Sequence, residues 1–212
     1  MLHSYNKIYL DDAMNNLAEA FHVAVKEYNY SLDYFMDIFI VSGIATHFEI
    51  GNPKYISGKS GTELVYDVVD LIGEPNNNLN NNSIYLVPGA EYWTGWVLAY
   101  YQWYSSKTFR EIHNIISMEK IYNMYHPYHE MDEEKIIEYI DSEASKNKTA
   151  RRLQAYRKLL GMSQSELAKE SGINLRTLQQ YEIGAKDIKK ASVSSVLALS
   201  NVLKCDVRDL FD

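Results

Sequence analysis

The sequence predicts an all-α fold in two domains, a larger helical N-terminal domain and a C-terminal domain of five short helices. Apolar residues recur at helical spacing through most of the 212-residue chain, which favours amphipathic helices. A Thr or Ser precedes a Glu by three residues at Thr108/Glu111 and Ser163/Glu166, the pattern of a capping box at a helix start. Charge divides the chain as well. Residues 1–148 hold 10 Lys/Arg against 21 Asp/Glu (net −11) and residues 149–212 hold 11 against 7 (net +4), which together give the −7 of the whole chain.

The charge pattern and the lack of sorting signals restrict the possible partners. An acidic region repels the phosphate backbone and a basic region attracts it, so only the C-terminal domain suits nucleic acid. Cys205 is the single cysteine, which excludes an intramolecular disulfide framework. No apolar run approaches the length that spans a bilayer, and Asp11 and Asp12 interrupt any signal-peptide layout. We therefore expect no membrane partner and a cytoplasmic location.

A series of helices is expected in the N-terminal domain. The first is capped by Asp11 and reaches Tyr28, because apolar residues repeat along one face. Others are expected at about 31–41, 44–51, 62–72, 91–104, 108–116 and 117–125. Trp93, Trp96 and Trp103 all fall within 91–104, which makes that helix the expected spine of the core. An asparagine-rich run at 76–82 predicts a loop, and residues 83–87 predict a short extended segment.

A strongly charged helix is expected to join the two domains. It begins near Met131 and continues to about residue 145, with Ile136, Ile137 and Ile140 as a narrow apolar stripe. The polar residues 146–148 then predict a joint. We therefore expect domains at 1–130 and 149–212, with residues 131–148 as a linker helix.

Two short helices with a tight turn between them are predicted within residues 163–182. Ser163 caps the first helix and Gly172 ends it, after which Asn174 caps the second. In the second helix, Leu178 and Tyr181 are spaced to face a core. Its remaining polar residues then face outward, which is the layout of a helix-turn-helix unit.

The C-terminal third resembles the phage repressor/Cro-type helix-turn-helix family, also called the xenobiotic-response-element family. The resemblance rests on Gln164, Leu167, Ala168, Gly172, Ile173, Leu178, Glu182, Gly184, Leu197, Leu203, Val207, Leu210 and Phe211. It implies a domain that binds double-stranded DNA, with a homodimer on a palindromic operator. The sequence departs from the family at Leu175, where a polar base-reading residue is common. Leucine there either packs on a thymine methyl group or makes no base contact.

The same resemblance, with the side-chain chemistry, implies which residues contact DNA. Arginine pairs with guanine and glutamine with adenine in the major groove, whereas lysines and helix starts hold phosphates. The expected base-contacting residues are Leu175, Arg176, Thr177, Gln179 and Gln180. The expected phosphate-contacting residues are Ser163, Gln164, Lys186, Lys189 and Lys190. The family also often pairs Arg157 with Glu182, an ion pair that would fix how the second helix projects from the domain.

Two motifs that suggest other chemistry are better explained as turns. Gly58-Lys59-Ser60 lacks the first glycine of a phosphate-binding loop, because Pro53 stands at that position. His126 and His129 have a metal-ligand spacing, but Pro127 lies between them and no further His or Cys joins them. They are expected to pack, with the neighbouring tyrosines, against the aromatic core. No serine or cysteine has the setting of a nucleophile, so we expect no enzyme, metal or cofactor.

Aromatic residues dominate the N-terminal domain, since 16 of the 18 tyrosines precede residue 149. Most must lie in a core, yet Tyr and Trp also dominate binding hot spots. Trp93, Trp96 and Trp103 are therefore candidate partner-binding residues. The segments SGIATHFEIGNPKY, GKSGTEL and EYWTGWVLAYYQWYSSKTFREI resemble a helical region of regulators associated with toxin–antitoxin operons.

That second resemblance implies an autoregulating antitoxin, whose N-terminal domain binds a cognate toxin protein and whose C-terminal domain binds the operator. One alternative is a stand-alone repressor whose N-terminal domain senses a small molecule. Another is an N-terminal enzyme fused to a DNA-binding domain, which a pocket with converging perturbed carboxylates would favour.

Overall fold

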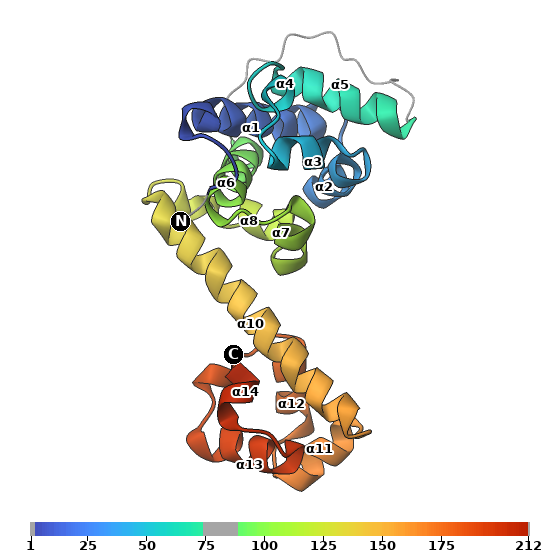
Figure 1. Cartoon of the computed structure of the whole chain (residues 1–212), viewed down its shortest axis with the longest axis vertical. Coiled ribbons are helices and arrows are strands. Elements are labelled where there is room, and N and C mark those ends of the chain that lie inside the picture. Colours follow the sequence, from blue (N-terminus) through green and yellow to red (C-terminus); the bar gives the residue numbers. More distant parts are fainter. Residues whose placement is uncertain (1–2, 74–88, 212) are drawn as a thin grey trace. The chain divides into compact units, whose positions relative to one another are not determined.

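The computed structural model describes residues 3–73 and 89–211, which form an all-α structure without strands, as the sequence predicts (Figure 1). The predicted loop at 76–82 and the extended segment at 83–87 lie outside these residues. The chain divides into two compact units, Met1–Glu138 and Tyr139–Asp212. Within the described ranges, no helix has both the length and the apolar character needed to cross a membrane.

The first unit contains nine α-helices within the described residues, together with the start of a tenth. They are preceded by the 3₁₀ helix η1 (Lys7–Tyr9). Their bounds are α1 (Leu10–Lys26), α2 (Leu32–Val41), α3 (Ile44–Glu49), α4 (Pro53–Ile56), α5 (Gly61–Ile72), α6 (Ala90–Ser105), α7 (Phe109–Ile115), α8 (Met118–Tyr122) and α9 (Tyr125–Tyr128). The tenth, α10 (Glu133–Leu159), continues into the second unit.

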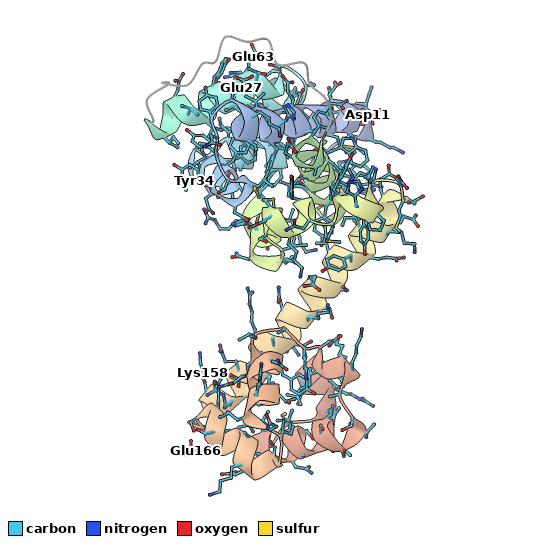
Figure 2. All side chains as sticks on the ribbon, turned by 180° about the vertical axis from the view of Figure 1, so that it is seen from behind. Asp11, Glu27, Tyr34, Glu63, Lys158 and Glu166 are labelled. Atoms are coloured by element: carbon cyan, nitrogen blue, oxygen red, sulfur yellow. The ribbon has the colours of Figure 1, made fainter. Side chains whose placement is uncertain are left out.

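Serine or threonine side chains cap the N-termini of several of these helices. Ser31 Oγ accepts a hydrogen bond from the Tyr34 N–H, and Thr108 forms a complete capping box with Glu111, as predicted. A further box joins Ser60 and Glu63, which is labelled in Figure 2. The prediction for Asp11 is wrong. Helix α1 begins at Leu10, after Tyr9, and has no side-chain cap, so Asp11 lies in its first turn, where a carboxylate interacts favourably with the helix dipole.

Helices α1 and α6 form the centre of the first unit (Figure 1). Helix α1 packs along α6 and, through another face, along α5. Its apolar residues Leu17 and Phe21 are fully buried, and so are Leu98 and Tyr101 of α6. The two helices approach closely because Gly95 has no side chain. A Cβ added there would lie 2.4 Å from the Leu17 carbonyl oxygen and 2.8 Å from Ala18 Cα.

We expect Gly95→Ala to lower the free energy of unfolding of the first unit by about 1–3 kcal/mol, the usual cost of overpacking a core. The obstacle is backbone of α1, which cannot rotate out of the way as a side chain would. Helix propensity alone predicts the opposite, a gain of about 1 kcal/mol for replacing a helical glycine by alanine. Thermal unfolding of the full chain therefore distinguishes the two effects, because overpacking lowers the melting temperature and helix propensity raises it. An unchanged or raised melting temperature would rule out the close helix contact.

Helix α10 runs without a break from Glu133 to Leu159, so the prediction of a joint at 146–148 is wrong. Neither glycine nor proline, the two residues that most destabilise a helix interior, occurs between these bounds. The polar residues at 146–148 lower helix stability only slightly. Packing also continues past the expected joint, because Thr149, Ala150 and Leu153 are buried. The expected linker helix and the first helix of the C-terminal domain are thus one element.

The second unit contains the C-terminal part of α10 and four shorter helices (Figure 1). These are α11 (Gln164–Ser171), α12 (Leu175–Glu182), α13 (Val193–Leu203) and α14 (Val207–Phe211), with a 3₁₀ turn η2 (Ile188–Lys190) after α12. They enclose one apolar core made of Leu153, Leu167, Ala168, Leu178, Tyr181, Ile188, Val196, Leu199, Leu203 and Leu210. This is the five-helix domain that the sequence predicts.

Candidate nucleic-acid interface

Helices α11 and α12 are joined by a short turn with a defined backbone. Glu166 and Ser163 form a complete capping box at the start of α11 (Figure 2). Gly172 ends the helix with a φ of 69°, a left-handed conformation that glycine adopts without strain. The side chain of Asn174 then accepts hydrogen bonds from the N–H groups of Arg176 and Thr177 and so caps α12. The turn therefore holds the two helices in a helix-turn-helix arrangement.

One face of α12 is buried and the opposite face is polar and accessible. Leu178, Tyr181 and Glu182 are buried in the second unit. Arg176 and Gln179 are exposed, Thr177 and Gln180 are half-buried, and Leu175 is 39% exposed. All five predicted base-contacting residues thus have accessible side chains on this short helix. Their arrangement suits a helix that enters the major groove.

The predicted phosphate-contacting residues have different local roles. Lys186 and Lys190 are exposed after α12. Lys189 is also exposed, and its Nζ donates a hydrogen bond of 2.9 Å to Ser145 Oγ on α10. Ser163 is the cap of α11, and its Oγ accepts from the Glu166 N–H at 3.2 Å. The Ser163 N–H donates to the Glu166 carboxylate at 2.7 Å, so a phosphate contact at Ser163 would use the hydroxyl proton rather than the backbone N–H.

The residues predicted as an ion pair, Arg157 and Glu182, lie in direct contact in the interior of the second unit. Arg157 Nε and Nη2 donate to the two carboxylate oxygens of Glu182 at 2.6 and 2.9 Å. Its third donor, Nη1, reaches the Met162 carbonyl at 2.7 Å. Arg157 is 8% exposed and Glu182 is 6% exposed. Two parallel hydrogen bonds are the strongest geometry for such a pair.

Gln164 connects this ion pair to the outer face of α12. Its Nε2 donates to Glu182 Oε2 at 2.7 Å, and its Oε1 accepts from Gln179 Nε2 at 3.5 Å. A predicted phosphate contact and a predicted base contact are therefore joined in one hydrogen-bond network with Arg157 and Glu182. The resemblance implied the Arg157–Glu182 pair, but nothing in the sequence indicated that Gln164 joins it to Gln179, because these residues are brought together only by the packing of α10, α11 and α12.

The network also determines the charge state of its members. Burial tends to raise the pKa of Glu182, but the hydrogen bonds from Arg157 and Gln164 outweigh it and leave that pKa below its ordinary value. The hydrogen bonds to Glu182 raise the pKa of Arg157 despite the opposing effect of burial. Both groups are thus charged at neutral pH, and the pair holds α12 against α10.

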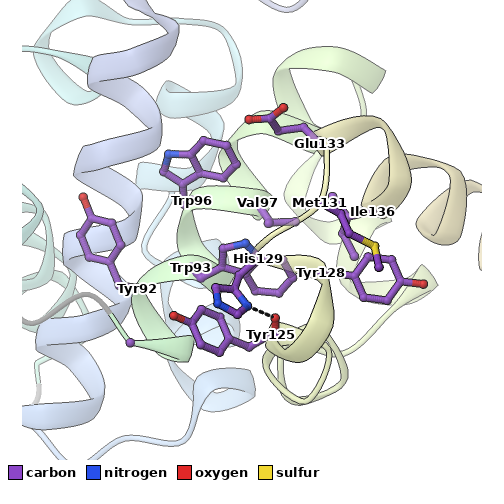
Figure 3. A pocket seen from close by; sticks show the side chains of 11 residues that line it. Tyr92, Trp93, Trp96, Val97, Tyr125, Tyr128, His129, Met131, Glu133 and Ile136 are labelled. Carbon is purple, nitrogen blue, oxygen red and sulfur yellow. Dashed lines mark hydrogen bonds between the residues drawn. The ribbon is translucent and has the colours of Figure 1, made fainter.

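In the first unit, Trp93 and Trp96 line a half-open cavity of about 360 Å³ between α6 and residues 125–136 (Figure 3). Trp103, the third predicted partner-binding tryptophan, does not line this cavity. It is only 6% exposed, its Nε1 donates to the Tyr5 carbonyl at 2.8 Å, and its ring stacks on His3. Core packing and the N-terminal segment cover this tryptophan.

The segment with His126 and His129 packs on α6, as the sequence predicted. Tyr125 lies edge-on against Trp93, with ring centroids 5.8 Å apart, and stacks on His129 at 4.1 Å. Across the described residues, no group of three or more His, Cys, Asp or Glu could hold a metal ion. The aromatic character of the segment was visible in the sequence, but the cavity was not. The i, i+3 spacing of Trp93 and Trp96 was the only available signal for it.

The capped turn, the accessible polar face of α12 and the five-helix core define a helix-turn-helix DNA-binding domain. Comparison with protein families agrees, since residues 153–210 match a helix-turn-helix family of the Cro/C1 type. The chain is therefore a DNA-binding transcriptional regulator. Searches of curated proteins and of solved structures found no match.

Proposed function

We propose that the protein is a sequence-specific regulator that inserts the N-terminal part of α12 into the major groove of its operator. The observation that carries this proposal is the outer face of α12, where Arg176 and Gln179 are exposed, above a buried Arg157–Glu182 pair. Arg and Gln are the side chains that form paired hydrogen bonds with guanine and adenine. A rigid support lets them keep the position that such contacts require.

Binding as a homodimer to a palindromic operator follows from the size of this surface. One helix of this kind reaches only a half-site, and two-fold proteins of this class read two half-sites about 34–36 Å apart. Lys186, Lys189 and Lys190 follow α12 and are exposed, which supports contacts with phosphates beside the groove, together with the backbone at the start of α11. These contacts supply affinity and register, whereas α12 supplies sequence preference.

For the N-terminal unit we propose a role as the input that controls DNA binding, in one of two forms. The cavity lined by Trp93 and Trp96 favours a small-molecule sensor, because ligand sites are usually preformed aromatic or apolar concavities. The antitoxin form, in which this unit binds a toxin protein, is supported by the sequence resemblance and by the same two half-buried tryptophans.

Footprinting on the DNA upstream of the protein's own gene tests the regulator function. We expect protection of an inverted repeat whose half-sites are one helical turn apart, and light scattering of the complex should give two chains per site. Protection without sequence preference, or one chain per site, would contradict the proposal. Co-expression with the product of the neighbouring gene separates the two forms, since only an antitoxin should co-purify with that product.

A further inference from the structure

The cavity in the first unit has walls contributed by three segments. Trp93 and Trp96 come from α6, Tyr125 and Tyr128 from α9, and Glu133 from the first turn of α10, with His129 between the last two (Figure 3). Its volume of about 360 Å³ lies within the range of small-molecule sites in proteins. The cavity is half-open, so a ligand can enter without a rearrangement of the helices.

The aromatic walls are held in place by contacts with one another. Trp93 and Trp96 are half-buried and lie three residues apart, on the same side of α6. The rings of Tyr125 and Trp93 make a T-shaped contact, and the Tyr125 ring also stacks on His129 with an interplanar angle of 19°. His129 Nδ1 lies 2.7 Å from the Tyr125 carbonyl oxygen, which fixes the imidazole ring. The rings are thus ordered before any ligand binds, which reduces the entropy lost on binding.

Carboxylates outnumber fixed positive charges around the cavity. Glu133 is the one acidic residue in the described lining, no Lys or Arg lines it, and the lining residue His129 has its Nε2 3.6 Å from the Glu130 carboxylate. Glu133 and its neighbours in sequence, Asp132 and Glu134, are exposed. Burial raises the pKa of Tyr100, and these three carboxylates raise it further, as expected where the local potential is negative. An aromatic ring also presents a negative face to a cation.

We propose that this cavity binds a small organic cation, with the positive centre against the tryptophan and tyrosine rings and near the Glu133 carboxylate. Aromatic faces and one carboxylate attract an ammonium-type group, whereas the same surroundings repel an anion and give a neutral molecule no electrostatic gain. The proposal rests on the sensor form of the proposed function and names the class of its ligand. Glu133 is also the first residue of α10, the helix that carries Arg157 in the DNA-binding unit.

Calorimetric titration of the full chain with phenyltrimethylammonium and with tert-butylbenzene, its neutral isostere, tests the charge preference. We expect the cation to bind about five- to thirty-fold more tightly, which corresponds to one carboxylate and a cation–π contact. Titration should also quench tryptophan fluorescence, because Trp93 and Trp96 line the cavity. Equal affinities, or no binding of either probe, would overturn the proposal.

Two single-charge variants supply the matched comparison. Glu133→Gln removes the carboxylate that lines the cavity, whereas Glu134→Gln removes the neighbouring carboxylate, which is exposed and outside the lining. We expect the first to weaken cation binding about five- to tenfold and the second to leave it nearly unchanged. An equal effect of both would mean that only the general acidity of the region matters, and would overturn the site. Trp93→Phe should reduce the quenching amplitude, and an unchanged amplitude would likewise place the cation elsewhere.

Footprinting on the operator distinguishes failure of the cavity proposal from failure of the proposed regulator function. If the probe cation does not bind while the footprint is intact, the cavity proposal fails and the regulator function stands. If the cation binds with the expected preference while no sequence-specific footprint exists, the site stands and the operator-binding function fails.

Discussion

Replacing Arg157 by alanine is expected to lower the free energy of unfolding of the C-terminal unit by about 3–5 kcal/mol. The substitution leaves the Glu182 carboxylate 6% exposed, with Gln164 as its remaining hydrogen-bond donor among the contacts described above. It also leaves the Met162 carbonyl without the Nη1 donor. Since a small domain is stable by only about 5–15 kcal/mol, melting curves of the full chain should show a marked loss. Operator affinity should fall with it, because α12 loses its support.

Three further variants show whether the loss comes from the pair. Arg151→Ala removes an exposed arginine from the same helix and should change stability little. Arg157→Lys keeps the charge but not the two parallel hydrogen bonds, so an intermediate loss is expected. In a double-mutant cycle with Glu182→Gln, the two losses should be strongly non-additive. Additive losses would show that the residues stabilise the domain independently.

The pH dependence of stability gives the pair a second signature. The folded-state pKa of Glu182 lies below its ordinary value, so its contribution to stability is complete above the unfolded-state pKa of about 4.3 and is lost as pH falls through the folded-state pKa. The stability difference between wild type and Glu182→Gln should therefore narrow below about pH 4.

Replacing Arg176 by alanine is expected to weaken operator binding by about 1–3 kcal/mol and to relax sequence preference at one base pair of each half-site. Arg176 is exposed on α12 and its backbone N–H is held by Asn174, so the variant should fold normally. Binding measured against a library of single-base operator variants would locate the affected position. Full retention of base preference in Arg176→Ala would remove this residue from the recognition surface.

Lys186→Ala is the matched comparison for Arg176→Ala, since it also removes one exposed positive charge. If Lys186 contacts a phosphate, it should contribute equally to the binding affinity for every DNA sequence. Its removal should lower all affinities by a similar factor and reduce the slope of affinity against salt concentration by about one. The two variants together separate recognition of bases from attraction to the backbone.

The sequence alone determined the features of this protein that depend on neighbouring residues. Caps at Thr108, Ser163 and Asn174, and the stop at Gly172, are local because side chain and backbone group lie within a few residues of each other. These signals and the apolar periodicity were sufficient for the all-α fold and the helix-turn-helix. They failed at Asp11, which lies inside the first turn of the helix rather than at its cap, and at 146–148, where a polar run belongs to a continuous helix.

Only the tertiary structure decided which distant residues meet. Gln164 looked like a surface residue, yet the packing of three helices places it between Glu182 and Gln179. Trp103 resembled its neighbours Trp93 and Trp96 in the sequence, but the N-terminal segment covers it while the other two line a cavity. Periodicity predicts the side of a helix on which a residue lies, and that is a property of one segment. Whether that side meets a core, a cavity or solvent depends on segments tens of residues away. The periodicity of one segment does not predict how those segments pack against it.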